Sequence, residues 1–398
     1  MMEAVRGWTG AQKRVVAAAY LAWTLDAFDF FLLIFVIKDV AAQFAASITT
    51  IAVATTLTLA MRPLGAFLFG RAADHFGRRP VLMVNIGVYS LLSFLTAFAP
   101  SVTFILVIRA LFGVGMGGIW GVGSSLAMET IKREARGAVS GLLQSGYSTG
   151  YLLASVVYGL FFSLIGWRGM FMVGVLPALT LIPFILASVP ESPSFTLSVS
   201  KPSIFAILRD HGKLALYAIV LMTAFNFFSH GTQDIYPTFL QKQHGLSPGA
   251  VGSIAVIYNI GAILGCFLFG SLSQRYGRRR MMITAALLAI PTIWLWAFSP
   301  GVAMLTLGAF LMQFFNQGCW SIIPAHLNEL SPRAARGTFP GTVYQLGNLF
   351  AAINLPLQSA IAEQQHSYGI AMGAVAFCAA VVISLLLAFG PEAHNAEM

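Results

Sequence analysis

Several acidic and basic side chains stand inside apolar stretches of this sequence, where a charge is costly and is usually retained for a function. Asp26 and Asp29 lie three residues apart in one such stretch, so on a helix they share a face. Two neighbouring carboxylates in a low-dielectric environment cannot both ionise cheaply, so at least one is expected to hold a proton. The pair therefore predicts a proton-coupling site, although one carboxylate could instead cap a helix or pair with a basic neighbour.

Arg62 is the basic candidate, in an apolar stretch eight residues before Gly70. A guanidinium group stays charged when it is desolvated and can bind a carboxylate through two parallel hydrogen bonds. Arg62 is therefore predicted to bind an anionic substrate. An internal ion pair with Asp26 or Asp29 is the alternative, and both can hold in different conformations. A second arginine in an apolar run, Arg109, is predicted to make a structural pair.

A polar stripe runs through residues 226–238. Asn226, His230 and Gln233 fall at positions i, i+4 and i+7, which is one face of a helix. Such a face has to line a cavity or contact other helices, because lipid satisfies no hydrogen bond. The stripe predicts hydrogen bonds to a substrate, and Asp234 beside it is a further candidate for the proton.

Membrane-spanning helices must position these residues. Of the 398 residues, 58% are hydrophobic and only 9% are charged, with a mean hydropathy of +0.79, whereas a soluble chain carries about 25% charged residues. This composition excludes a soluble enzyme, a disulfide scaffold and a disordered chain. Apolar runs of the length that crosses a bilayer predict an all-α membrane protein with twelve transmembrane helices, at 15–38, 48–71, 80–99, 102–130, 137–164, 168–189, 213–240, 248–272, 280–299, 302–328, 338–362 and 367–390.

The basic residues predict how the chain is oriented. Eighteen of the 23 lysines and arginines fall at every second connection between the predicted helices or in the N-terminal tail. By the positive-inside rule these segments are cytoplasmic. Both termini are therefore predicted to be cytoplasmic, in a multi-pass protein of the inner (cytoplasmic) membrane. The net charge of +9 then reflects orientation, and no nucleic-acid partner is expected.

An internal repeat divides the chain. At an offset of 200 residues, 65–79 matches 265–279 at eight of fifteen positions. Two six-helix halves with a substrate site between them are typical of secondary transporters. The predicted boundaries are 1–189 for the N-terminal bundle, 190–212 for a cytoplasmic linker and 213–398 for the C-terminal bundle. Repeat-equivalent helices carry the remaining candidate substrate-binding residues: Gln144, Tyr147, Tyr344, Gln345 and Asn348.

The segment from Gly70 to Arg79 resembles the loop signature of the major facilitator superfamily. The resemblance extends over essentially the whole chain and implies the major facilitator fold. It also implies a gate that holds helix ends together, formed by Gly70, Asp74, Gly77, Arg78, Glu129, Arg136, Gly270, Arg278, Glu329 and Arg336. Glu129 with Arg136, and Glu329 with Arg336, are the expected salt bridges. Gln274 replaces the aspartate in the second copy of the signature, which weakens a symmetric ion-pair gate.

The stretch 226–238 also fits the pattern N-x-x-[ST]-H-x-[ST]-Q-D-x-x-x-T, which resembles the lactate/pyruvate–proton symporters of the yeast type. That resemblance narrows the superfamily to the branch of sialate and monocarboxylate proton symporters. It implies a secondary active transporter, not an enzyme, that carries a small monocarboxylate such as lactate or pyruvate with a proton by alternating access.

Two other functions remain open at this point. The Asp26-x-x-Asp29 pair is similar to that of aromatic-acid proton symporters, so sialate or aromatic acids are the alternative substrates. A drug/proton antiporter is less favoured. Antiporters of the superfamily usually carry a Gly-Pro-rich signature in the fifth span, and residues 141–146 contain no proline. The proton is the only coupling ion expected, and no cofactor or metal is expected, because no phosphate-binding loop or metal-ligand spacing occurs. The expected partners are a small organic acid and the lipid bilayer, and the carrier is expected to work as a monomer.

Overall fold

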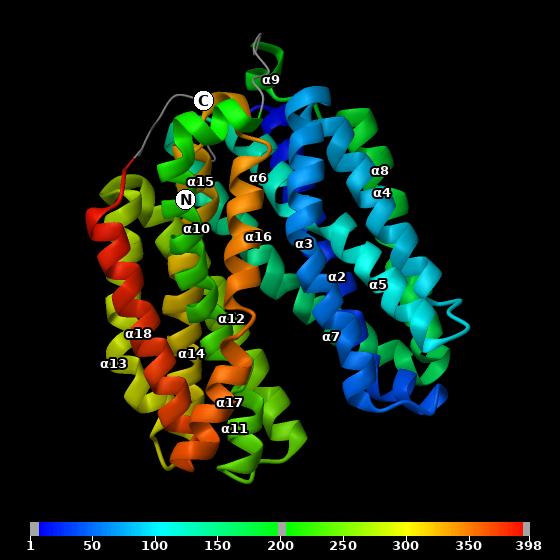
Figure 1. Cartoon of the computed structure of the whole chain (residues 1–398), viewed down its shortest axis with the longest axis vertical. Coiled ribbons are helices and arrows are strands. Elements are labelled where there is room, and N and C mark those ends of the chain that lie inside the picture. Colours follow the sequence, from blue (N-terminus) through cyan, green and yellow to red (C-terminus); the bar gives the residue numbers. More distant parts are fainter. Residues whose placement is uncertain (1–7, 198–203, 393–398) are drawn as a thin grey trace.

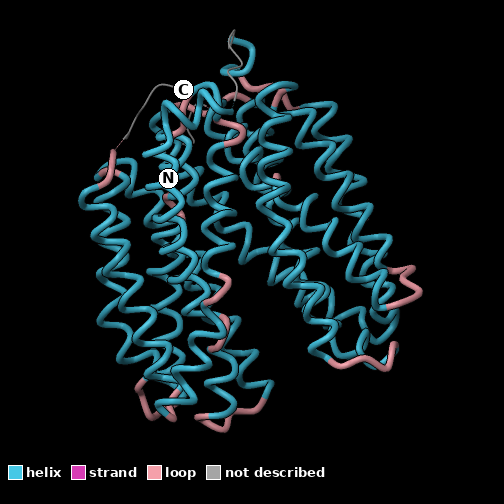
Figure 2. Tube along the Cα trace, in the orientation of Figure 1, coloured by secondary structure: helices cyan, strands magenta, loops and turns pink. Residues whose placement is uncertain are grey.

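Helices form the whole framework of the part of the chain that the structure describes. The structure is a computed structural model that describes residues 8–197 and 204–392, and short turns join its helices (Figure 2). Ten stretches of these residues are helical, long and apolar enough to cross a membrane. The predicted all-α fold is therefore confirmed.

The first group of helices spans residues 10–188. Its elements are α2 (Gly10–Gln43), α3 (Ile48–Phe76), α4 (Arg78–Thr96), α5 (Val102–Gly117), α6 (Ile119–Thr130), the short 3-10 helix η1 (Arg133–Ala135), α7 (Arg136–Gly174) and α8 (Leu176–Ser188). In this group α2 packs along α7 and α3 packs along α5. The contact between α3 and α5 is made through backbone, because a Cβ atom on Gly113 would lie 2.2 Å from the carbonyl oxygen of Thr58.

The second group repeats this arrangement after the short helix α9 (Pro193–Leu197). Its elements are α10 (Ile204–Gln233), α11 (Tyr236–Lys242), α12 (Pro248–Tyr276), α13 (Arg278–Ala297), α14 (Val302–Trp320), α15 (Ile323–Leu330), the 3-10 helix η2 (Arg333–Ala335), α16 (Phe339–Ala351), α17 (Asn354–Gln365) and α18 (Tyr368–Phe389). Here α12 packs along α14 and α10 along α16, which are the contacts expected at the 200-residue offset. In Figure 1 the two groups lie side by side.

The repeat is most regular at the turns after α3 and α12. Both helices begin after a serine whose side chain accepts a hydrogen bond from the backbone of the first turn, Ser47 and Ser247. Both end at a glycine with positive φ, 103° at Gly77 and 96° at Gly277. Only glycine adopts such a conformation without strain, and it lets α4 and α13 turn back along the preceding helix.

The count of ten candidate spans differs from the predicted twelve at two places. Residues 133–188 form one continuous stretch, in which Gly166 (φ 60°) turns the chain between two parts of α7. The predicted span 338–362 is broken between Ala351 and Asn354, so α16 and α17 are each too short to count separately. The number of membrane crossings and the side on which the termini lie stay predictions.

The predicted linker, 190–212, is partly helical. It contains α9, and α10 begins at Ile204, nine residues before the predicted span, with a non-helical residue at His211. Residues 198–203 lie outside the described part of the chain. The start of α10 has only five apolar residues, 204–208, before Arg209 and Asp210, and so carries no long apolar run that hydropathy alone would find.

The two groups contact each other at one end of the bundle and diverge toward the other (Figure 1). We call the end that carries the turns at Gly77 and Gly277 the gate end, and the opposite one the far end. At the gate end a Cβ on Gly70 would lie 2.7 Å from the carbonyl oxygen of Gly337, and a Cβ on Gly270 would lie 2.7 Å from the Cα of Gly141. Glycine at these positions is what allows the two backbones to touch.

Candidate functional site

Asp26 and Arg62 form an ion pair in the interior of the first group. Nη2 of Arg62 lies 3.3 Å from Oδ2 of Asp26, and both side chains are buried. The other Asp26 oxygen and Nε of Arg62 have no hydrogen-bond partner among the described residues. An unpaired charged atom costs free energy when it is buried. The pair is therefore incompletely satisfied and has capacity for a further ligand. It corresponds to one of the alternatives left open for Arg62.

Asp29 belongs to a second acid–base pair. Its Oδ1 accepts a hydrogen bond of 3.2 Å from the Ser93 hydroxyl, and it interacts electrostatically with Arg109 on α5. Arg109 is fully buried, with its guanidinium 3.9 Å from the centre of the Phe112 ring, a cation–π distance. None of its three side-chain nitrogens has a hydrogen-bond partner in the described part of the chain. Asp26 and Asp29 thus share a helix face but face different arginines.

The polar stripe of α10 contacts α16 through His230. Its Nδ1 lies 3.1 Å from Oδ2 of Asp234, and its Nε2 lies 3.0 Å from Oδ1 of Asn348. Both contacts are to oxygen atoms, so an imidazole that carries two protons donates to both. The His230 and Asp234 side chains are 30% and 36% exposed, and His230 also interacts electrostatically with Arg62 of the other group. His230 and Arg62 therefore belong to one electrostatic site.

Other candidates are engaged within their own group. Nδ2 of Asn226 donates to the carbonyl of Met222 (2.8 Å), and Nε2 of Gln233 donates to Gln313 on α14 (3.1 Å). Oε1 of Gln144 accepts from the Trp120 indole at 3.4 Å. These three side chains are positioned by hydrogen bonds that do not involve the acid–base pairs. Their distance from a bound substrate stays a prediction.

Gln345 differs from them. Its side chain is 1% exposed, and both its amide oxygen and its amide nitrogen have no partner within residues 8–197 and 204–392. Buried amides are usually hydrogen-bonded. Gln345 is therefore the neutral candidate with the most hydrogen-bonding capacity left over.

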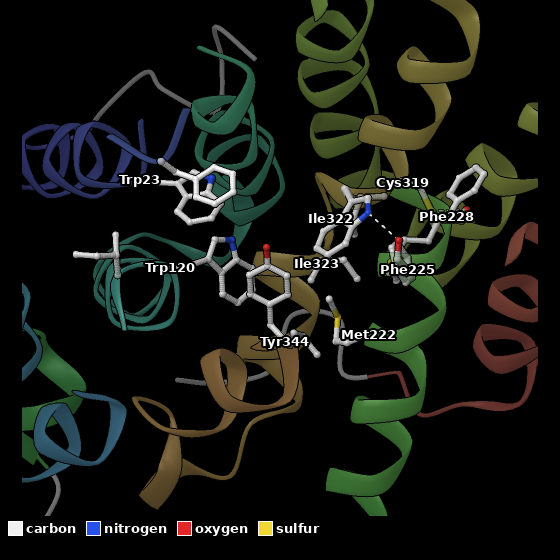
Figure 3. Close-up of a cluster of buried hydrophobic side chains, with 14 of the residues drawn as sticks. Trp23, Trp120, Met222, Phe225, Phe228, Cys319, Ile322, Ile323 and Tyr344 are labelled. Carbon is white, nitrogen blue, oxygen red and sulfur yellow. Dashed lines mark hydrogen bonds between the residues drawn. The ribbon is translucent and has the colours of Figure 1, made fainter. Parts of the chain in front are cut away.

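Aromatic rings surround the charged residues: Tyr147 and Tyr344 were candidates from the sequence, whereas the tryptophans beside them were not. Tyr147 on α7 lies within electrostatic range of Asp26, Arg62, Asp234 and Tyr344. The Tyr344 ring lies 4.8 Å from that of Trp120 and 5.5 Å from that of Trp320. Figure 3 shows Trp120 and Tyr344 next to each other, with Trp23 nearby. The two tryptophans are 200 residues apart, so the repeat places them at equivalent positions of the two groups.

A ladder of rings continues along α2 and α7. Phe31 lies 5.3 Å from Tyr147 and 4.8 Å from Tyr151, and Phe35 stacks on Tyr158 at 5.2 Å between ring centres. The spacing of the tyrosines (147, 151, 158) at i, i+4 and i+11 was the signal that could have found this face.

At the gate end, Asp74 bridges the two groups. Its carboxylate accepts hydrogen bonds from the backbone of Gly337 (2.7 Å) and Thr338 (3.0 Å) and from the Thr338 hydroxyl (2.6 Å). Gln274, at the repeat-equivalent position, accepts from the backbone N–H of Gly137 at 3.1 Å. The glutamine therefore keeps the contact between the groups without the charge, because a backbone N–H needs only an acceptor oxygen.

The ion pairs of the gate lie both within each group and between the two groups. Nη1 of Arg136 lies 3.8 Å from Oε1 of Glu329 in the other group, whereas the partner expected from the sequence was Glu129 of its own group. Arg278 binds the same Glu329 at 2.9 Å, and Arg78 lies 3.1 Å from Glu129. Arg336 interacts electrostatically with Glu129, and burial lowers the pKa of Arg336 to about 10. It stays charged at neutral pH.

Two glutamates of the gate end were not identified from the sequence. The Glu191 carboxylate accepts from the backbone N–H groups of Arg78 (3.0 Å) and Arg79 (3.2 Å), which cap the start of α4. Glu392 accepts from the backbone of Arg279 (3.2 Å) at the start of α13. Each follows a proline, at 190 and 391, and this second repeat at an offset of 201 was the available signal.

The described residues contain no group of three or more His, Cys, Asp or Glu side chains that could hold a metal ion. The three cysteines are free thiols. The site therefore consists of two buried acid–base pairs, a histidine–carboxylate pair and a set of aromatic rings. This arrangement can bind an anion and move a proton.

The chain is similar in sequence and structure to known proteins. The family model described as the Major Facilitator Superfamily matches residues 19–233 and 219–397. The carboxylic acid transporter protein homolog of Saccharomyces cerevisiae is 30% identical over 385 residues, which cover 89% of this chain but only 62% of the yeast protein, so the chain spans less than two thirds of that relative. The sialic acid transporter NanX of Escherichia coli is 25% identical over 95% of this chain and 94% of its own. The solved structure of the proton:xylose symporter XylE superposes with a TM-score of 0.80 at 18% identity, over 97% of both chains.

Proposed function

This chain belongs to the major facilitator superfamily, and we propose that it imports a small monocarboxylate, such as lactate or pyruvate, together with a proton. The observation that carries the proposal is the buried Asp26–Arg62 pair, because it joins a group that can bind a carboxylate to a group that can bind a proton. The carboxylic acid and sialic acid transporters among its relatives support an organic acid as the substrate.

Coupling follows from competition for Arg62. While Asp26 is ionised it holds the guanidinium, and a substrate carboxylate has to compete with it. When Asp26 takes up a proton, the attraction is lost and Arg62 can bind the substrate instead. Each carboxylate then enters with one proton, and the loaded carrier gains no net charge. Asp29 with Arg109 is the second candidate for the same role, since it repeats the acid–base arrangement in the same group.

The neutral and aromatic residues complete the substrate site in this proposal. His230 and Asn348 approach from the second group and lie in the electrostatic environment of Arg62. They would hydrogen-bond the hydroxyl or keto group of the substrate, while Gln345 supplies unpaired amide atoms. A site shared by two groups is opened to one side of the membrane when the groups rock against each other.

The gate contacts give the conformational half of the mechanism. The groups are held together at the gate end by Asp74, by Gln274 and by the Arg136–Glu329 pair. If the gate end is cytoplasmic, as the basic residues predict, the structure is the outward-facing state. Breaking these contacts is then the step that releases substrate to the cytoplasm.

A ring-bearing acid, such as sialate or an aromatic acid, is a second candidate substrate. The aromatic rings of the site favour it, because rings bind planar or cyclic ligands by stacking. The hydroxyl groups of Tyr147 and Tyr344 make no hydrogen bond with any described residue and are available to a ligand. A three-carbon acid would leave most of these rings uncontacted.

Uptake into proteoliposomes distinguishes the candidates. Labelled lactate, pyruvate, sialate and benzoate are offered separately, with the outside acidic and then with no pH gradient. Monocarboxylate symport predicts accumulation of lactate or pyruvate that requires the pH gradient and is unchanged by a potassium diffusion potential. Accumulation of sialate or benzoate alone would select the second candidate, and pH-independent uptake of every acid would refute proton coupling.

A further inference from the structure

A basic pocket lies at the turn between α12 and α13, away from the substrate site. It is lined by Arg275, Tyr276, Gly277, Arg280 and Glu392 and has a volume of about 300 Å³. Arg275 and Arg280 are exposed, and the Arg275 guanidinium lies 5.4 Å from the centre of the Tyr276 ring. The pocket therefore presents two arginines beside one aromatic ring.

The two arginines have capacity for an external anion. Neither guanidinium group makes a hydrogen bond or an ion pair within residues 8–197 and 204–392. Glu392 is the acidic residue of the pocket, and its carboxylate is engaged by the backbone of Arg279 (3.2 Å). The Arg279 side chain donates to the carbonyls of Leu387 and Ala388, so it is tied to α18. The pocket keeps an excess of positive charge.

The position of the pocket relates it to lipid. It lies directly beyond the apolar, outward-facing surface of α12, where Leu264 and Leu268 are exposed, and Tyr276 marks the boundary with 49% of its surface exposed. Exposed aromatic rings and arginines at the end of an apolar span lie at the depth of lipid headgroups. An anion at that depth in a membrane is the phosphate of a phospholipid.

A hollow in the first group shares two repeat-equivalent positions with this pocket, His75 and Phe76, and has different chemistry. It lies along α3, is about 350 Å³ in volume and is lined by Phe67, Leu68, Arg71, Ala72, His75 and Phe76. At the 200-residue offset His75 and Pro80 stand where Arg275 and Arg280 stand. The arginine pair is therefore a property of the second group, and not of the repeated fold.

We propose that the pocket at the α12–α13 turn binds the headgroup of an acidic phospholipid in the leaflet that faces the gate end. Arg275 and Arg280 contact the phosphate, and Tyr276 contacts the start of the acyl chains. A net-negative headgroup is preferred over a zwitterionic one, because a choline would place its own positive charge beside the two arginines. The proposal does not depend on which acid the carrier transports.

Native mass spectrometry of the purified carrier tests the site. The full chain in detergent is titrated with phosphatidylglycerol or with phosphatidylcholine, and the dissociation constant of the first bound lipid is measured. An arginine near an anionic lipid contributes a factor of about five, so the Arg275→Gln/Arg280→Gln variant is expected to bind phosphatidylglycerol about 25-fold more weakly. Its affinity for phosphatidylcholine should not change.

The matched control removes two exposed basic residues of the gate end outside the pocket, as Arg209→Gln/Lys213→Gln. It should keep the wild-type preference for phosphatidylglycerol. An equal loss of affinity for phosphatidylglycerol in the control and pocket variants would overturn the proposal, since net charge alone would then explain binding. Competition by inorganic phosphate at the lipid concentration would also overturn it, because the pocket would then be an anion site with no use for the acyl chains. A thermal midpoint equal to wild type shows that the pocket variant is folded.

Discussion

Gly70 offers a direct test of the gate, because its role rests on a short distance between backbones. An alanine there would place its Cβ 2.7 Å from the carbonyl oxygen of Gly337 and 2.7 Å from the Cα of Thr338. Neither atom belongs to a flexible side chain. The two groups have to move apart by a few tenths of an ångström or more at this contact. In a state with an open gate the clash disappears.

The size of the effect follows from that geometry. Overpacking a tight contact costs about 1–3 kcal/mol, and here the cost falls on the closed gate only. The ratio of open to closed molecules should therefore rise by about 5- to 150-fold in the Gly70→Ala variant. Gly270→Ala meets the Cα of Gly141 at 2.7 Å in the equivalent contact and should act in the same direction.

Double electron–electron resonance measures the population without transport. Nitroxides are attached to cysteines replacing Lys132 and Arg280, which are exposed residues at the gate end of the two groups, in a background without the three natural cysteines. The Gly70→Ala variant should shift the distance distribution toward longer values. Gly87→Ala is the control, because its Cβ meets nothing closer than Ile182 Cδ1 at 3.8 Å. A distribution unchanged by Gly70→Ala would refute the reasoning that this contact holds the gate closed.

Three further outcomes are expected. Arg62→Gln should weaken binding of the transported acid by about 10- to 150-fold, the range for losing a hydrogen bond to a charged group, whereas wild-type affinity in a calorimetric titration would make Arg62 structural. Asp26→Asn or Asp29→Asn, as a permanently neutral side chain, should retain substrate counterflow and lose pH-driven accumulation; accumulation that persists in both single variants and in the double variant would remove this pair from coupling. His326→Leu should raise the thermal midpoint, because both ring nitrogens of the fully buried His326 have no partner among the described residues. Leu126, the residue at the equivalent position of the first group, is buried too and shows that leucine fits there. A lowered midpoint would show that His326 makes a needed polar contact.

The sequence predicted best those features that are set within a single helix, such as its position and its end. Long apolar runs predicted helices, and the 200-residue repeat predicted that α3 and α12 end in equivalent turns, as they do at Gly77 and Gly277. The break between α16 and α17 falls at residues 352–353, where the apolar run itself gives no sign of it. The local signal is Pro356, which has no backbone N–H to donate to the carbonyl of Ala352 four residues earlier. Asn354 also donates to the carbonyl of Phe227 on α10, a contact between helices that hydropathy does not reveal.

The sequence also did not predict which residues of the two groups pair with each other. Spacing along the chain placed Glu329 and Arg336 at the gate, but it could not reveal that Arg136 pairs with Glu329 from the other group. Likewise Asp26 and Asp29 were equal candidates for Arg62, since helical periodicity gives a shared face and not the neighbour that each side chain meets. Depth along the helix is readable from sequence, whereas the rotation of one helix against another is set by packing.

The repeat gives independent support for the pairing of the buried charges. At the 200-residue offset Asp26 and Arg62 correspond to Asn226 and Ala262, and Asp29 and Arg109 correspond to Ser229 and Ala309. In each case the acid and its base are both charged in the first group and both neutral in the second. A lone buried charge would be strongly destabilising, so residues that pair have to be charged or neutral together. This explains why the second group supplies neutral or hydrogen-bonding residues where the first supplies charges. It also predicts that the Asp26–Arg62 ion pair is replaced with least damage by changing both of its members to the residues of the second group. Arg62→Ala with Asp26→Asn should therefore be more stable to heat than Arg62→Ala alone, and an additive loss in the double variant would show that the two residues do not act as a pair.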